Sequence, residues 1–208
     1  MKRISGLYAI TPDTDDTAAL LEKVEAALSG GARLLQYRNK TASAALRLTQ
    51  GRALLALCWK FQAPLIINDH LDLALALDAQ GLHVGGEDGS ASEARRQLGP
   101  DKILGVSCYG KLDNAHHAVE AGATYVAFGG FYPSQVKPGN ARNPVSLLSE
   151  AKRTLKVPVV AIGGITVVNA PALIDAGADS IAVISALFTE PDIRGAARNF
   201  SKLFRRRP

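Results

Sequence analysis

Short apolar runs alternate with helical patterns along this chain, and that alternation constrains the fold more than any other feature. Runs of this kind, bounded by glycine or polar residues, are typical of parallel strands that are covered on both faces. Eight of them are predicted as strands: Leu7–Ile10, Arg33–Arg38, Pro64–Asn68, Gly81–Val84, Ile103–Ser107, Tyr125–Gly129, Pro158–Gly163 and Ser180–Ile184.

Helical periodicity fills the intervals between these strands. It is clearest over Thr17–Ser29, Ala42–Phe61, Leu71–Ala79, Leu112–Ala121 and Ser146–Thr154. Glycine-containing segments at Gly30–Ala32, Ala121–Ala123 and Ala176–Asp179 are predicted to end helices and lead into the next strand. Ser90 and Glu93 have the spacing of a capping box at the start of the helix after the fourth strand.

A strand followed by a helix, repeated eight times, predicts a single-domain (β/α)₈ TIM barrel. An open doubly wound sheet is the alternative, but no G-x-G-x-x-G follows the first strand. No linker, low-complexity tract or shift in composition divides residues 1–208, so one domain is expected, with a short basic tail at about 205–208.

Composition limits the possible partners. The chain is 47% hydrophobic and 21% charged, as in soluble globular proteins, and its net charge of +5 suits anionic ligands without requiring nucleic acid. No stretch approaches the roughly 18 apolar residues of a membrane helix, so a cytoplasmic protein without a membrane partner is expected. Cys58 and Cys108 are too far apart in sequence to suggest a zinc site or a disulfide framework. The sequence leaves the oligomeric state open.

Two aspartates end neighbouring predicted strands. Asp69 follows the third strand and Asp88 follows the fourth. Because the carboxyl ends of adjacent strands lie close together, these side chains are expected to converge on one ion at the rim where barrel active sites form. Mg²⁺ is commonly held by one or two carboxylates together with phosphate oxygens. The alternative is that each aspartate only caps a helix or stabilises a turn.

Basic and amide side chains leave the second strand at alternate positions. Gln36, Arg38 and Lys40 point the same way if the strand continues that far, which presents an amide, a guanidinium and an ammonium group on one surface. This set is suited to gripping a diphosphate. A solvated basic turn is the competing interpretation.

Two later regions also predict anion binding. Lys137 lies in a long Gly/Pro-rich connection, residues 131–144, of the length typical of lids and binding loops. Gly163 and Gly164 after the seventh strand, and Ser185 after the eighth, match the usual place of a phosphate site in barrel enzymes. A surface lysine on a solvated loop is the alternative for Lys137.

Few other residues suggest chemistry. Ser107 ends the fifth strand and can offer a hydroxyl to a ligand. His83 lies inside the fourth strand and is interpreted as a core histidine with satisfied hydrogen bonds rather than a base. No Ser–His–Asp arrangement has a convincing context.

The ordered motifs resemble those of the thiamine phosphate synthase family. The resemblance covers Leu7 to Phe188 and rests on LYAITP, QYRNK, IINDHLDLALA, GLHVGGED, ILGVSCY, YVAFGGFYPSQVKP, VVAIGGIT and AGADSIAVISALF. It implies a (β/α)₈ barrel that joins hydroxymethylpyrimidine diphosphate to a thiazole phosphate, or its carboxylated form with loss of CO₂. The implied products are thiamine phosphate and pyrophosphate. It also implies a dissociative substitution assisted by Mg²⁺, with no nucleophile from the protein.

The resemblance also implies roles for individual residues. The implied pyrimidine diphosphate site comprises Gln36, Tyr37, Arg38, Asn39, Lys40, Asn68, Ser107 and Lys137, of which Arg38 and Lys137 are the implied catalytic residues. The implied thiazole phosphate site comprises Ser134, Gln135, Val136, Gly163, Ile184 and Ser185, and the implied metal ligands are Asp69 and Asp88. Val136 stands where the family often has threonine, so a hydroxyl contact is lost there. The alternatives are a thiazole tautomerase of the same superfamily and a non-catalytic phosphate-binding barrel.

Overall fold

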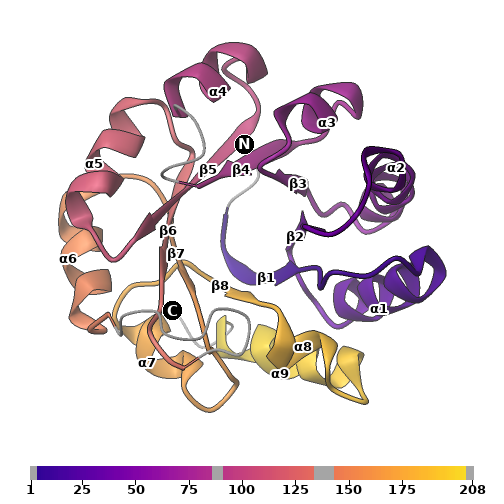
Figure 1. The fold of residues 1–208 in the computed structure, drawn as a ribbon. Helices are drawn as coiled ribbons and strands as arrows, with labels where there is room; N and C mark the ends of the chain where they lie inside the picture. The colour runs from indigo at the N-terminus through magenta and orange to yellow at the C-terminus, as the bar shows by residue number, and fades with distance from the viewer. Residues whose placement is uncertain (1–3, 86–90, 134–142, 205–208) are drawn as a thin grey trace.

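A computed structural model describes residues 4–85, 91–133 and 143–204 and has the predicted architecture. Eight parallel strands close into a barrel in the order β1 to β8, with β8 pairing to β1. Figure 1 looks along the barrel axis and shows the helices as a ring outside the strands. The strands are β1 Gly6–Ile10, β2 Leu34–Tyr37, β3 Leu65–Asn68, β4 Gly81–Val84, β5 Ile103–Tyr109, β6 Tyr125–Gly129, β7 Val159–Ile162 and β8 Ser180–Val183.

The helices follow the strands in alternation, which confirms the predicted (β/α)₈ barrel. They are α1 Thr17–Ser29, α2 Ala44–Lys60, α3 Leu71–Ala76, α4 Ala91–Leu98, α5 Leu112–Glu120, α6 Ser146–Thr154, α7 Ala170–Asp175, α8 Ser185–Phe188 and α9 Ile193–Leu203. Most predicted bounds agree to within one or two residues. The main difference is α3, which ends at Ala76 rather than Ala79; Asp78, with a φ of 49°, lies just beyond it.

Alternation along the strands divides the core into two layers. Leu7 and Ala9 on β1 face the helices and belong to the larger apolar layer between barrel and helices. Tyr8 and Ile10 face the barrel axis and belong to a smaller inner cluster with Tyr125 of β6. Successive strand residues point to opposite faces, so each strand contributes to both layers. The inner layer fills the barrel interior directly beneath the carboxyl ends of the strands.

Glycines end several helices as the sequence predicted. Gly31, Gly122 and Gly177 follow α1, α5 and α7 with φ values of 106°, 89° and 117°. This left-handed conformation costs little for glycine and lets the chain turn into the next strand. After α1, the amide of Ala32 donates to the carbonyl of Ala27 at 3.1 Å, which satisfies a terminal helix carbonyl.

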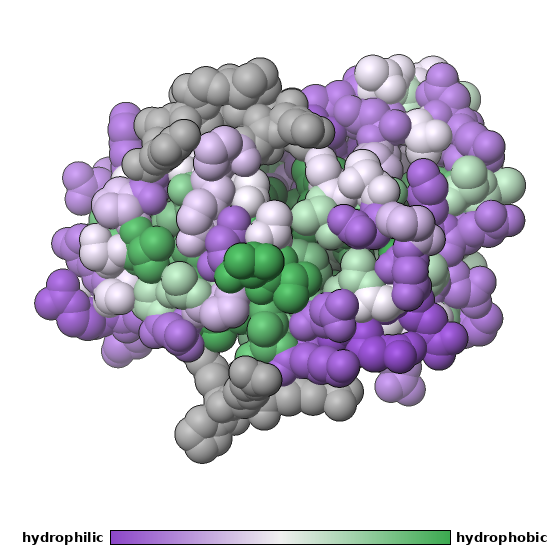
Figure 2. Space-filling view, turned by 90° about the horizontal axis from the view of Figure 1, so that it is seen from below, coloured by the Kyte–Doolittle hydropathy of each residue, from purple (hydrophilic) through white to green (hydrophobic). Residues whose placement is uncertain are grey.

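One outer face of the helix ring is mainly polar (Figure 2). Figure 2 shows one side of the barrel, where hydrophilic residues cover most of the surface around a small central hydrophobic area. Within the described ranges, no helix is both long and apolar enough to cross a membrane. The predicted basic tail and the predicted capping serine Ser90 lie outside the described residues.

Candidate active site

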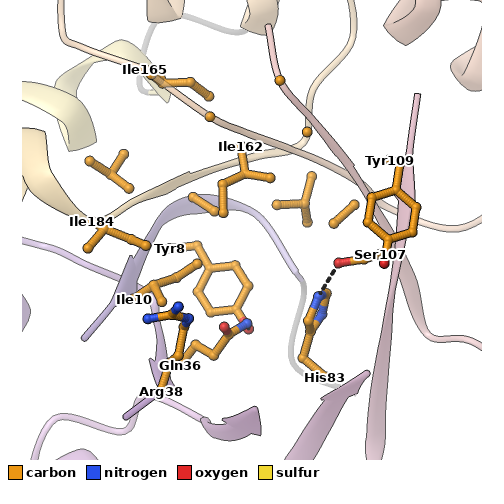
Figure 3. Close-up of a pocket in the computed structure, with 18 of the residues that line it drawn as sticks. Tyr8, Ile10, Gln36, Arg38, His83, Ser107, Tyr109, Ile162, Ile165 and Ile184 are labelled. Atoms are coloured by element: carbon orange, nitrogen blue, oxygen red, sulfur yellow. Dashed lines mark hydrogen bonds between the residues drawn. The ribbon is translucent and has the colours of Figure 1, made fainter. Parts of the chain in front are cut away.

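A cavity of about 730 Å³ opens at the carboxyl ends of the strands, where the sequence predicted the site. Figure 3 shows Gln36, Arg38 and Tyr8 on one side of it and His83, Ser107 and Tyr109 on the other. The predicted site residues that line this cavity are Gln36, Arg38, Lys40, Asn68, Asp69, Ser107, Gly163, Ile184 and Ser185. The structure therefore brings together predicted residues from five of the eight strand ends.

The Arg38 side chain is held by an aspartate in the β1–α1 connection. Its Nη1 donates to both carboxylate oxygens of Asp13, at 3.1 and 3.2 Å. Its backbone is fixed as well, because the amide of Arg38 donates to Thr11 Oγ1 at 2.9 Å and that hydroxyl donates to the Arg38 carbonyl at 2.8 Å. Asp13 also accepts from the amide of Lys40 at 2.8 Å. One carboxylate thus holds the guanidinium of Arg38 and the backbone of Lys40.

Tyr37 and Asn39 lie behind the cavity wall rather than on it. The Tyr37 hydroxyl donates to Gln50 Oε1 at 2.7 Å, and Asn39 Nδ2 donates to the same oxygen at 3.1 Å. Both side chains are buried between β2 and α2, and neither lines the cavity. The structure does not bring these two side chains together with Gln36, Arg38 and Lys40, because alternate residues face opposite sides of the wall.

Asp69 faces the cavity from a left-handed backbone position after β3. Its φ is 60°, and its amide donates to the carbonyl of His83 on β4 at 2.9 Å. Asn68 Nδ2 donates to Asp69 Oδ2 at 2.6 Å, which orients the carboxylate. The following helix begins after His70, and no side chain caps it. Asp69 is therefore not used as a helix cap, which was the alternative interpretation.

Five polar side chains form a continuous hydrogen-bonded chain at the base of the cavity. Gln36 Nε2 donates to the Tyr8 hydroxyl at 3.0 Å, and the hydroxyls of Tyr8 and Tyr125 are 2.8 Å apart. Tyr125 Oη lies 2.9 Å from His83 Nδ1, and His83 Nε2 lies 2.9 Å from Ser107 Oγ. Burial lowers the pKa of His83 to about 4 and raises the pKa of both tyrosines, so all three side chains are neutral near pH 7.

The opposite wall of the cavity consists of backbone and apolar side chains from β7 and β8. Gly163 and Gly164 have φ values of 106° and 65°. A Cβ on Gly164 would lie 2.2 Å from the carbonyl oxygen of Pro133, so the β7–α7 loop packs directly against the segment that follows β6. Ile162 and Ile184 line the same wall, and Ser185 begins α8.

Residues 7–187 match the family model described as thiamine monophosphate synthase. The chain belongs to the thiamine monophosphate synthase family. It is 55% identical over 202 residues to the thiamine-phosphate synthase of Nitrosomonas eutropha, covering 97% of this chain and 95% of that protein. It is also 55% identical over 203 residues to that of Thiobacillus denitrificans, covering 98% and 96%.

A solved structure supports the same assignment. The chain shares 35% identity and a TM-score of 0.85 with a thiamine phosphate pyrophosphorylase from Pyrococcus furiosus, covering 96% of this chain and 95% of that one. A 3-hexulose-6-phosphate synthase, at 19% identity and a TM-score of 0.69, shares the fold alone.

In this member of the thiamine monophosphate synthase family, several predicted residues lie outside the described ranges. They are Asp88, Lys137 and the segment Ser134, Gln135 and Val136. The expectation of a binding loop or lid around Lys137 therefore remains a prediction.

The structure places several further residues at the site that the sequence patterns did not indicate. Asp13 holds Arg38, Tyr8 lines the cavity floor, and Asn143 lines the cavity while donating through Nδ2 to the carbonyl of Gly129. Only Tyr8 had a local indication, because its alternation with Leu7 and Ala9 on a short strand placed it on the inner face. The interpretation of His83 as a satisfied core histidine was partly right: its hydrogen bonds are satisfied, but it also lines the cavity.

Proposed function

We propose that this protein is a thiamine-phosphate synthase. It transfers the pyrimidinylmethyl group of 4-amino-2-methyl-5-(diphosphooxymethyl)pyrimidine to the nitrogen of a thiazole phosphate, releasing pyrophosphate. With the carboxylated thiazole, CO₂ is also lost. Family membership over nearly the whole chain supports the reaction class, a transferase of thiamine biosynthesis.

One observation carries the assignment to this cavity. Arg38, Lys40 and Asp69 line the same space as the glycine-rich β7–α7 loop and Ser185. A diphosphate needs cations and a metal-binding carboxylate, whereas a single phosphate ester is often held by backbone amides near the last two strands. These features support the binding of two phosphorylated substrates side by side in this cavity.

The reaction fits a site without a protein nucleophile. The bond between the pyrimidine methylene carbon and the diphosphate oxygen breaks, and its electron pair leaves with pyrophosphate. The thiazole nitrogen then donates an electron pair to the methylene carbon, which is a cation stabilised by the 4-amino group. Arg38 and Lys40 stabilise the charge that develops on the leaving oxygen, and Asp13 keeps Arg38 aimed there.

Water must be kept from the methylene cation. The side chains of Ile162, Ile165 and Ile184 line the cavity on the proposed thiazole side, as Figure 3 shows. An apolar wall of this kind reduces the number of ordered waters near the reacting carbon. Lys137, an expected diphosphate contact, belongs to the proposal on the resemblance alone.

Mg²⁺ is the proposed metal. The carboxylate of Asp69, oriented by Asn68, offers hard oxygen ligands on the diphosphate side of the cavity, which fits a magnesium ion. In the part of the chain that the structure describes, no group of three or more His, Cys, Asp or Glu residues could hold a softer metal. Asp69 with Asp88 would hold the ion, which when bound would neutralise charge on the diphosphate.

A direct assay tests the proposal. Incubation with both substrates and Mg²⁺ should release pyrophosphate and form thiamine phosphate in equal amounts. Omission of the thiazole phosphate should abolish thiamine phosphate formation. Isomerisation of the carboxylated thiazole without pyrophosphate release would instead identify a tautomerase, which has no diphosphate to bind. Binding of the pyrimidine diphosphate and the thiazole phosphate without formation of thiamine phosphate would identify a non-catalytic barrel.

A further inference from the structure

The hydrogen-bonded chain from Gln36 to Ser107 crosses the inside of the barrel and connects two sides of the cavity. Its members come from five strands: Gln36 from β2, Tyr8 from β1, Tyr125 from β6, His83 from β4 and Ser107 from β5. Four of them line the cavity, whereas Tyr125 is fully buried and does not. The Tyr125 hydroxyl therefore reaches the cavity only through its neighbours.

The position of Tyr125 depends on a glycine in the adjacent strand. A Cβ on Gly105 would lie 2.1 Å from Cζ and 2.3 Å from Oη of Tyr125. The phenol thus occupies the space that a side chain on β5 would need, and its ring stacks on the imidazole of His83 with centroids 5.6 Å apart. The β5 strand leaves room for the central link of the chain.

Counting hydrogens gives the chain one direction. Gln36 Nε2 donates to the Tyr8 oxygen, so Tyr8 uses its own proton toward the Tyr125 oxygen. Tyr125 in turn donates to His83 Nδ1, which leaves the single ring proton of neutral His83 on Nε2, facing Ser107 Oγ. With Gln36 in this orientation, the opposite direction would leave the Tyr8 proton buried without an acceptor.

We propose that Tyr8, Tyr125 and His83 form a hydrogen-bond relay that couples Gln36 to Ser107 and holds His83 as its Nε2–H tautomer. The Ser107 oxygen accepts from His83, so its own proton is available to an acceptor in the cavity. Gln36 donates one of its Nε2 hydrogens to the Tyr8 hydroxyl and can present Oε1 as an acceptor in the cavity. Tyr8, Tyr125 and His83 are positioning residues. They determine that Ser107 donates a hydrogen bond to the substrate and that Gln36 Oε1 accepts one.

The inference rests on the proposed function for the identity of the substrate. A 4-aminopyrimidine offers an amino donor beside a ring-nitrogen acceptor, which matches Gln36 Oε1 and the Ser107 hydroxyl. A 4-oxopyrimidine offers the reverse, a carbonyl acceptor beside an N–H donor, and leaves both contacts mismatched. The relay is therefore a specificity determinant for the amino-substituted ring.

The tautomer of His83 can be measured without any substrate. We expect ¹⁵N NMR of the unliganded protein at pH 7 to show His83 with a protonated Nε2 and an unprotonated Nδ1, with its signals assigned by their loss in His83→Gln. An Nδ1–H tautomer, or an imidazolium, would overturn the proposal. Because this measurement needs no turnover, the expected tautomer in a protein that releases no pyrophosphate would refute the proposed function and leave the relay standing.

A double-mutant cycle tests whether Tyr125 acts through Ser107. Tyr125→Phe should raise KM for the pyrimidine diphosphate about tenfold, as expected for one lost hydrogen bond, and leave KM for the thiazole phosphate unchanged. In a Ser107→Ala background, the same change should raise KM less than about twofold, because the contact that it controls is already absent. Independent, multiplicative effects would contradict the relay.

Ser180→Ala is the matched control for this cycle. Its hydroxyl is also fully buried and donates to the carbonyl of Gly6 at 2.8 Å, but it lies at the first residue of β8, away from the cavity mouth. The variant loses a buried hydroxyl hydrogen bond without touching the relay. A similar rise in KM for the pyrimidine diphosphate in Ser180→Ala would assign the Tyr125 effect to general loss of stability and overturn the proposal.

Discussion

At the scale of single residues, the site depends on side chains that hold other side chains. Asp13 orients Arg38, Asn68 orients Asp69, and burial keeps His83 neutral. Such supporting contacts matter because a charge stabilises a transition state only if it is already aimed at the place where charge develops.

Asp69→Asn should lower activity by at least about a hundredfold at limiting Mg²⁺, because the amide loses the charge that would bind the ion. Asparagine tolerates the left-handed backbone at this position, so the thermal midpoint should change by only a few degrees. Pyrophosphate release as a function of Mg²⁺ concentration measures the effect. Asp78→Asn is the control, because Asp78 also has a positive φ, of 49°, but precedes β4 at the other end of the barrel. Near-normal activity of Asp69→Asn would contradict the metal assignment.

Asp13→Ala should reduce kcat about tenfold or more with a smaller change in KM, because it frees Arg38 without removing the guanidinium. Steady-state kinetics with both substrates measure this. Asp15→Ala, an exposed aspartate in the same connection, should behave like the wild type. Equal effects of the two variants would show that Asp13 acts only through the net charge of the loop.

The buried imidazole of His83 should make stability depend on pH. Burial lowers its pKa from 6.5 to about 4, so the unfolded chain binds a proton that the folded protein excludes. Stability from this group is fully present above about pH 6.5 and is lost as the pH falls toward 4, by up to roughly 3 kcal/mol. Urea unfolding across this range measures the slope, and His83→Gln should flatten it. The same slope in wild type and His83→Gln would mean that folding does not change the pKa of His83.

At the scale of elements, two loops meet across the mouth of the barrel. The β7–α7 loop can approach the segment after β6 because Gly164 has no side chain. The two proposed substrate sites use different strands: β2 to β5 supply the polar wall, and β7 and β8 supply the backbone and apolar wall. A change in one set of loops should therefore affect one substrate more than the other.

Gly164→Ala should raise KM for the thiazole phosphate at least about tenfold and change KM for the pyrimidine diphosphate little. The added Cβ would overlap the Pro133 carbonyl and displace the loop. Gly99→Ala is a matched control, because Gly99 also has a positive φ, of 78°, but has no atom within 4 Å of an added Cβ. Both variants carry backbone strain, so only the clash differs. Similar KM values for the thiazole phosphate in the two variants would contradict a role of the β7–α7 loop in binding that substrate.

At the scale of the whole molecule, the barrel closes only when its two ends meet. The amide of Gly6 donates to the carbonyl of Asp179 at 3.0 Å, and β1 pairs with β8. The last long helix, α9, packs against α1 and β1, so the end of the chain covers its beginning. This long-range closure predicts that the fold is lost as one unit.

Phe200→Ala on α9 should lower the free energy of unfolding by about 3–5 kcal/mol, since this fully buried ring leaves a cavity. Loss of helical circular dichroism and loss of activity should occur at the same urea concentration, although α9 does not line the site. Arg198→Ala, at an exposed position of the same helix, should shift neither curve. Two separate transitions in Phe200→Ala would contradict unfolding as a single unit.

The sequence alone determined the features that depend on near neighbours in the chain. Strand and helix order, helix ends at glycines, and the placement of Gln36, Arg38 and Asp69 at strand ends all follow from local periodicity and backbone preference. Alternation even implied that Gln36 and Arg38 share a face, which the structure shows. The family motifs added the reaction, and a cytoplasmic location and the role of Asp88 remain predictions.

Only the tertiary structure decided which distant side chains meet. Tyr8 and Tyr125 are 117 residues apart and join across the barrel interior, and Tyr125 reaches His83 because Gly105 leaves room. Tyr37 and Asn39 belong to the same motif as Arg38, yet they bond to Gln50 on the helix side of the wall. Such contacts depend on strand register and barrel closure, which place side chains across a shared interior, and local sequence carries no measure of either.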